Sequence, residues 1–125
     1  GIMKLIIAGG REFTTGQAVA LVEKALTSSG LLPQITEIVH GGCLGIDSGA
    51  HRVCSHLWPI KVFPAKWSEH GRAAGPIRNV EMAAYADKLL LIWDGKSRGS
   101  ASMKREMQKL GKPVYEYIAS AGNPA

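Results

Sequence analysis

The sequence has little of what marks disulfide-rich or metal-binding proteins. It contains two cysteines, Cys43 and Cys54. On one helix these would lie about 16 Å apart along the axis, at about 1.5 Å per residue, whereas a disulfide requires Cα atoms within about 7 Å. Neither a C-x-x-C pair nor an H-x-x-x-H pair occurs. We therefore predict no metal site, and no cofactor is identified.

Long apolar runs are also missing. No run approaches the roughly 18 residues of a membrane-spanning helix, and no secretory signal segment precedes the first apolar run. We therefore expect a soluble, cytoplasmic protein without a membrane partner.

Charge is not concentrated in any segment. The net charge is +5, but the basic residues are dispersed and interrupted by acids, with no basic tail or block. The most basic stretch, residues 96–109, is interpreted as a nucleic-acid patch, as a solvated helix face or as part of a site for a compact anion. The dispersal of charge argues against a nucleic-acid partner.

What the sequence does contain is an alternation of short apolar runs with helical periods, and 46% of its residues are hydrophobic. The i, i+3, i+4 stripes predict helices, and five apolar runs predict strands at residues 4–9, 35–40, 60–65, 88–94 and 113–118. This alternation predicts an α/β fold, a Rossmann-like three-layer sandwich whose parallel sheet of about five strands has helices on both faces. Residues 3–118 would form one domain and residues 119–125 a flexible C-terminal tail.

Glycine and polar residues follow the predicted strands, at the edge where an open parallel sheet binds its ligands. We predict that the loops after the strands converge on one crevice. The candidate ligand-binding residues are Gly9, Gly10, Arg11, Gly41, Gly42, Gly45, Asp47, Trp67, Gly75, Arg78, Asn79, Asp94, Gly95, Ser97, Gly99 and Ser100.

The stretch HGGCLGID, residues 40–47, places three glycines before a predicted helix. Gly41, Gly42 and Gly45 allow a tight turn, positive φ and close approach of the backbone to a ligand, and the N-terminus of the helix favours an anion such as phosphate. The pattern is neither a G-x-G-x-x-G fingerprint nor a Walker-type loop, and a tight turn without a ligand is the alternative. Asp47 either complements the helix dipole or accepts hydrogen bonds from ribose hydroxyls.

A second informative stretch is PAKWSEHGRAAGPIRNVEM, residues 64–82. Pro76, at the first helical position, would start a helix, with Arg78 and Asn79 in its first turn. Arg78 is a good phosphate donor, and a structural salt bridge is the alternative. Trp67 either stacks on a base or packs over the core.

Four stretches, GGREF, HGGCLGID, PAKWSEHGRAAGPIRN and DGKSRGS, in this order, resemble the YspA-related proteins of the SLOG superfamily. That superfamily groups Rossmann-like domains related to DprA/Smf and to the LOG proteins. The resemblance runs from about Lys4 to about Ile118. It implies a nucleotide or nucleotide-derived ligand in the glycine-lined crevice, and a homodimer or higher homo-oligomer.

The LOG proteins of this superfamily cleave nucleoside 5'-monophosphates, using an R-K-x-x-M and a P-G-G-x-G-T-x-x-E motif. Residues 78–82 match the first motif as R-N-x-x-M. Gly99 and Ser100 align with part of the second, but Met103 stands where the glutamate is expected, and Glu106 lies three residues further on.

Three functions follow from this sequence. The first is binding of a nucleotide or phosphorylated nucleotide derivative, with a sensor domain as one form of this function. The second is a nucleotide-processing hydrolase in which Arg78, Asp47 and Asp94 are the catalytic candidates. The third, which dispersed charge disfavours, is binding of single-stranded nucleic acid in the manner of DprA. Whether the chain is an enzyme is left open.

Overall fold

A computed structural model describes residues 1–122 of the chain, and the end of the predicted tail, residues 123–125, lies outside the described part. Its centre is one sheet of parallel strands in the order β3-β2-β1-β4-β5. This confirms the predicted α/β, Rossmann-like fold with a five-stranded parallel sheet. The strands are β1 (Lys4–Gly9), β2 (Glu37–His40), β3 (Ile60–Val62), β4 (Lys88–Trp93) and β5 (Val114–Ile118).

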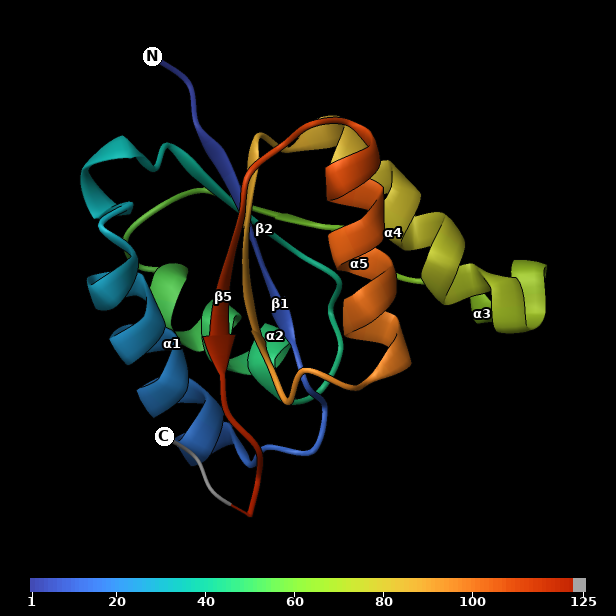
Figure 1. Cartoon of the computed structure of the whole chain (residues 1–125), viewed down its shortest axis with the longest axis horizontal. Helices are drawn as coiled ribbons and strands as arrows, with labels where there is room; N and C mark the ends of the chain where they lie inside the picture. The colour runs from blue at the N-terminus through green and yellow to red at the C-terminus, as the bar shows by residue number, and fades with distance from the viewer. Residues whose placement is uncertain (123–125) are drawn as a thin grey trace.

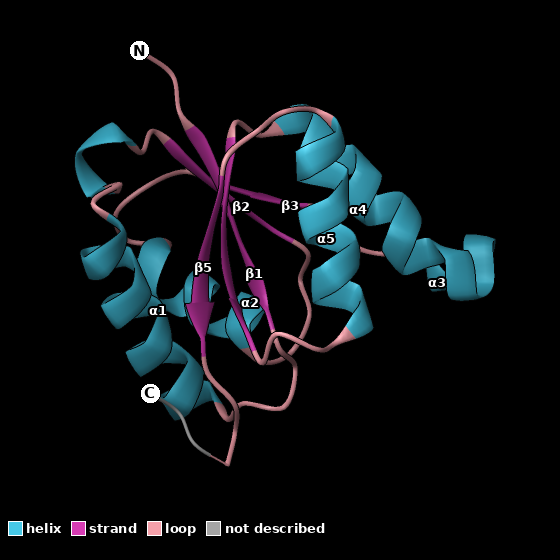
Figure 2. Cartoon of the chain, in the orientation of Figure 1, coloured by secondary structure: helices cyan, strands magenta, loops and turns pink. Residues whose placement is uncertain are grey.

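Helices cover both faces of the sheet (Figures 1 and 2). One face carries α1 (Thr15–Ser29) and α2 (Ile46–Cys54), and the other carries α4 (Ala74–Tyr85) and α5 (Arg98–Lys109). A short helix, α3 (Trp67–His70), and the 3-10 turn η2 (Gly71–Ala73) precede α4, and a second 3-10 turn, η1 (Leu32–Gln34), follows α1.

The continuous apolar strands are explained by burial on both faces. Leu5 and Ile7 of β1 pack into the cluster under α1 and α2, whereas Ile6 between them packs under α4 and α5. In β4 the same alternation places Leu90 in the first cluster and Leu91 in the second. Because every second residue faces each helical layer, a strand in this sheet needs apolar residues at successive positions.

The chain reverses its direction across the sheet at β1. The strands β2 and β3 lie to one side of β1, and β4 and β5 lie to the other. The loops that follow β1 and β4 therefore separate at the carboxyl edge of the sheet, which leaves room for a ligand.

Several element boundaries differ from the sequence predictions. The strand β3 ends at Val62, before Pro64, which has no N–H to donate to a ladder. The helix α4 begins at Ala74, so Pro76 is its third residue, where a missing N–H is still tolerated, and Arg78 lies in the second turn. Ala119, assigned to the tail, is buried and donates its N–H to the Trp93 carbonyl.

Candidate functional site

A crevice of about 760 Å³ opens at the carboxyl edge of the sheet. We call it the switch-point crevice. Its walls are the loop after β1, part of the loop after β2, the N-terminal part of α4 and one face of α5 along its length. The predicted residues that line it are Gly9, Gly10, Arg11, Asp47, Trp67, Gly75, Arg78, Asn79, Ser97, Gly99 and Ser100.

The other predicted ligand residues lie outside this crevice. Gly41 and Gly42 line an adjacent hollow of about 360 Å³, to which Arg11 and Trp67 also contribute. Gly45, Asp94 and Gly95 line neither cavity. The loops therefore converge as predicted, but the three glycines of residues 40–47 do not form the floor of the large crevice.

The glycines of this loop are required by contacts within the protein. At Gly45, which has φ of 78°, a Cβ would come 2.3 Å from the Gly10 carbonyl oxygen. At Gly41 a Cβ would come 2.3 Å from Nη1 of Arg78. Glycine is thus needed where the loops after β1 and β2 meet and where Arg78 crosses the backbone.

Asp47 occupies the anion position that the sequence assigns to a phosphate. Its Oδ2 accepts hydrogen bonds from the amides of Gly41 at 3.2 Å and Cys43 at 3.1 Å. Burial raises the pKa of this carboxyl, against the two amide bonds and the nearby charges of Arg78 and Arg11, which lower it. The amide of Ile46, the first residue of α2, donates to the Gly10 carbonyl.

Arg78 is 6% exposed and makes its hydrogen bonds inside the protein. Its Nη1 donates to the Gly41 carbonyl at 2.8 Å and to the Phe63 carbonyl at 3.4 Å, and its Nε donates to Asn79 Oδ1 at 3.1 Å. Nη2 contacts Cys43 Sγ at 3.8 Å. Arg78 therefore holds α4 against the loop after β2 through carbonyl acceptors, and not through the salt bridge that the sequence analysis gave as the alternative.

The loop after β4 is organised by Asp94. Its Oδ1 accepts from the amides of Lys96 at 2.8 Å and Ser97 at 2.9 Å, and these bonds lower the pKa of the carboxyl. Asp94 thus stabilises the turn that leads into α5 and does not line the switch-point crevice.

The first turn of α5 opens on the crevice. The amides of Arg98, Gly99 and Ser100 donate to no acceptor within residues 1–122, and Ser97, the N-cap, makes no side-chain capping bond. Asn79 Nδ2 donates to the Gly99 carbonyl at 3.3 Å and holds this turn against α4. Free amides at the positive end of a helix form an anion-binding position.

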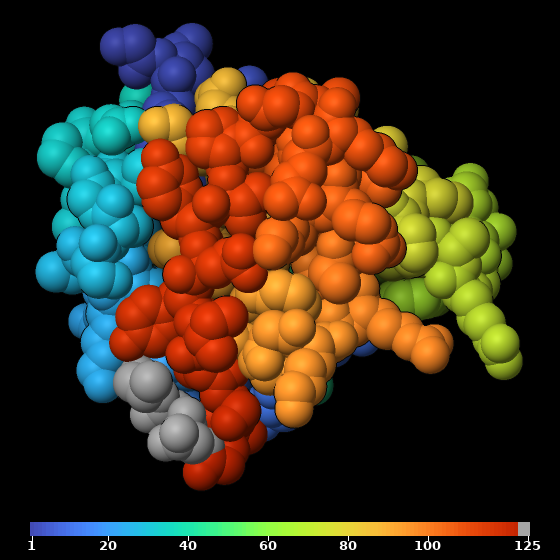
Figure 3. Space-filling view, in the orientation of Figure 1, coloured from blue at the N-terminus to red at the C-terminus, as the bar shows by residue number. Residues whose placement is uncertain are grey.

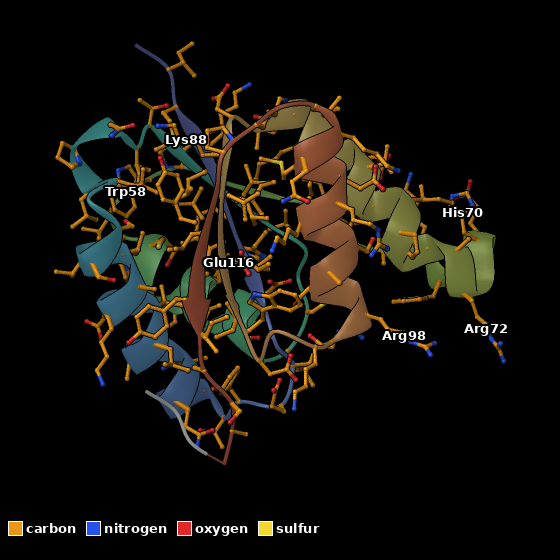
Figure 4. The ribbon with its side chains drawn as sticks, in the orientation of Figure 1. Trp58, His70, Arg72, Lys88, Arg98 and Glu116 are labelled. Atoms are coloured by element: carbon orange, nitrogen blue, oxygen red, sulfur yellow. The ribbon has the colours of Figure 1, made fainter. Side chains whose placement is uncertain are left out.

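The basic stretch of residues 96–109, which the sequence analysis considered as part of an anion site but did not assign to the crevice, contributes several lining residues on α5. The cations Arg98, Arg105 and Lys109 line the crevice together with Arg11. Figure 4 shows Arg98 extending from the lower end of α5. In the space-filling view, a notch separates this end of α5 from α3 and α4 (Figure 3). The helical spacing of residues 98, 102, 105 and 109 is the signal that identifies this face.

The carboxylates of the crevice do not reproduce the glutamate of the LOG motif. Met103 is buried in the core. Glu106 reaches the crevice but is paired with Lys109 at 3.1 Å. Glu12, which the sequence analysis did not select, also lines it and has no hydrogen bond or ion pair with another described residue.

Two further properties concern the part of the chain that the structure describes. No helix there is long and apolar enough to cross a membrane. No group of three or more His, Cys, Asp or Glu side chains there is arranged to hold a metal ion.

Comparison with known structures supports the fold assignment. The chain is similar in fold to DNA processing protein A from Helicobacter pylori, whose structure is described for its unique single-stranded DNA binding mode. The TM-score is 0.61 at 22% identity, over 98% of this chain and 68% of that one. This likeness supports the Rossmann-like fold, while membership of the SLOG superfamily and of its YspA-related group stays a prediction.

This comparison overturns one prediction, which disfavoured a nucleic-acid partner, because a protein of this fold is described as binding single-stranded DNA. The prediction failed because it judged charge along the sequence. Cations that are dispersed there, Arg11, Arg98, Arg105 and Lys109, come together around one crevice in the fold.

No family model matches the chain. A sequence relative is the Gene 61 protein of Mycobacterium phage D29, which is 39% identical over 90 residues, covering 64% of this chain and 70% of that protein. The chain therefore belongs to the same protein family as the Gene 61 protein of Mycobacterium phage D29.

Proposed function

We propose that the switch-point crevice binds a nucleotide or a phosphorylated nucleotide derivative, with its phosphate at the start of α5. The observation that carries this proposal is the row of free amides at Arg98, Gly99 and Ser100, which opens on the crevice. These amides and the Arg98 and Arg11 side chains supply both directed donors and positive charge to one phosphate.

The remainder of the crevice suits the rest of a nucleotide. Its volume of about 760 Å³ is within the usual range of small-molecule sites, roughly 300–1,000 Å³. Met82 and Met103 give it an apolar wall, and Trp67, which is half exposed at its edge, offers a face for a base. Glu12 is a free acceptor for ribose hydroxyls.

Arg78 has a limited role in the proposed phosphate site. Its Nε and Nη1 are used by protein acceptors, and Nη2 contacts Cys43 Sγ at 3.8 Å. Nη2 is the donor left for a ligand, so we assign first contact with the phosphate to α5 and only secondary contact to Arg78.

A thermal-shift screen of mononucleotides, nucleotide sugars and dinucleotides tests this function. A ligand at 100 times its Kd adds about 2.7 kcal/mol of stability. Replacement of Arg11 by Ala should weaken binding, whereas Arg72→Ala, which removes an exposed cation from η2 outside the crevice, should not. If no nucleotide raises the melting temperature, the proposal is wrong.

Binding of single-stranded DNA is a second candidate, because four cations from two elements surround the crevice and the DNA processing protein A structure is described as binding it. Fluorescence anisotropy with a labelled oligodeoxythymidine distinguishes the two. A strand that contacts several phosphates loses affinity steeply with salt, and Arg105→Ala should reduce that slope. A mononucleotide held at α5 alone should show little dependence on Arg105.

A further inference from the structure

A second cleft, separate from the switch-point crevice, lies beside α2. Its volume is about 650 Å³, and we call it the histidine cleft. It is bounded by the end of β2, the start of α1 and the exposed side of α2. No aspartate or glutamate lines it, and its lining residues include His40, His51, Arg52, Ser55, His56 and Thr15.

Hydrogen bonds determine where the protons of two of these histidines lie. The Gly42 amide donates to Nδ1 of His40 at 3.0 Å, so a neutral His40 carries its proton on Nε2. That nitrogen lies 2.9 Å from Nδ1 of His51, which must therefore accept. A neutral His51 then carries its proton on Nε2, and this N–H has no acceptor among the described residues.

The direction of these two hydrogen bonds, from the Gly42 amide to His40 and from His40 to His51, is maintained at neutral pH. His40 is 3% exposed, and burial, together with the charge of His51, lowers its pKa from 6.5 to about 4. A proton on His40 Nδ1 would also oppose the Gly42 amide. Because of these two hydrogen bonds, His51 presents its Nε2–H, a donor and not an acceptor, to the cleft.

Among the described residues that line the cleft, Arg52 carries a fixed positive charge and none is a carboxylate. Arg52 is exposed and forms no ion pair with a described residue. The carboxylate on the same helix, Asp47, is turned to the amides of Gly41 and Cys43. Since guanidinium, imidazole N–H and hydroxyl groups all donate to phosphate oxygens, the cleft offers several donors and no competing carboxylate.

We propose that the histidine cleft is a second anion site, which binds a phosphate group through Arg52, His51 and His56. It does not depend on the function assigned to the switch-point crevice, from which it is separated by the loop of residues 41–43; Cys43 lines both cavities. The phosphate comes either from inorganic phosphate or from the backbone of a nucleic acid.

Histidine ring signals in NMR test this site directly. Inorganic phosphate, added at constant ionic strength with chloride as the reference, should shift the rings of His51 and His56 saturably, with a Kd on the order of millimolar for a few charge-assisted hydrogen bonds. The double variant Arg52→Ala/His56→Ala should weaken this binding about tenfold or more, the loss of roughly one such bond.

The chain offers a matched control for this variant. His70 and Arg72 also form a histidine and arginine pair, but they lie on α3 and η2, on the other side of the sheet (Figures 1 and 4). The double variant His70→Ala/Arg72→Ala should bind phosphate as the unmodified protein does. Equal loss in both double variants would show non-specific attraction and overturn the proposal.

A second titration, with a short single-stranded oligonucleotide, identifies the source of the phosphate. If inorganic phosphate saturates the shifts of these rings at a lower concentration than the oligonucleotide does, the ligand is the free anion. If the oligonucleotide saturates them at the lower concentration, the ligand is the nucleic-acid backbone. Either order supports the site if Arg52 and His56 are required. Absence of a saturable shift with both probes would refute it.

Discussion

Replacement of Arg78 by alanine should unfold the protein more readily, because the side chain connects three segments from the inside. It is 6% exposed, and its guanidinium donates to Gly41, Phe63 and Asn79. A buried acceptor left without its donor costs about 1–3 kcal/mol, and Asp47 would lose the favourable charge of Arg78. We expect a loss of about 3 kcal/mol in the free energy of unfolding, a large part of the 5–15 kcal/mol that is typical.

Urea unfolding followed by circular dichroism measures this loss. Arg78→Lys should recover only part of it, because lysine keeps the charge but lacks the planar fork that reaches three acceptors. Arg72→Ala, an exposed position, should change stability by no more than about 0.5 kcal/mol. If Arg78→Ala is destabilised by less than about 1 kcal/mol relative to that control, the structural role assigned to Arg78 is wrong.

Two further predictions concern the loop of residues 40–47. Gly41→Ala should destabilise the fold by about 1–3 kcal/mol, since its Cβ would lie 2.3 Å from Arg78 Nη1. The control in the same urea assay is Gly16→Ala, whose Cβ meets nothing within 4 Å. Equal stability of the two variants would contradict the prediction. The second concerns His40, whose pKa falls to about 4 in the folded protein. The unfolded chain then binds more protons below about pH 6.5, so stability is full above that pH and falls toward pH 4, by about 3 kcal/mol at most. Urea unfolding at several pH values should show this slope and its reduction in His40→Gln; an unchanged slope in the variant would show that other groups cause it.

The sequence predicted the sheet well because both of its sides are buried. The runs that became β1 and β4 are apolar at nearly every position, a pattern typical of strands between two helical layers. The edge strand β3 was predicted too long, since Val62 is already exposed and Pro64 prevents further pairing.

The sequence predicted the edge of the sheet at which the crevice lies, but it placed the phosphate at a different helix from the one that we propose. The sequence motif placed the phosphate at the start of α2, where the structure has Asp47 as an internal acceptor. A carboxylate one residue into the helix was the available signal. The free amides at α5 were harder to predict, because whether an N-terminus is capped depends on where neighbouring loops lie in three dimensions.

The most direct test of the central claim, that the start of α5 holds the phosphate of a nucleotide, is an amide NMR titration. Nucleoside monophosphate should shift the backbone signals of Arg98, Gly99 and Ser100 saturably, while the corresponding nucleoside without phosphate should leave them in place. If these amides do not shift, or if the shifts are centred on residues 41–45 instead, the central claim is wrong.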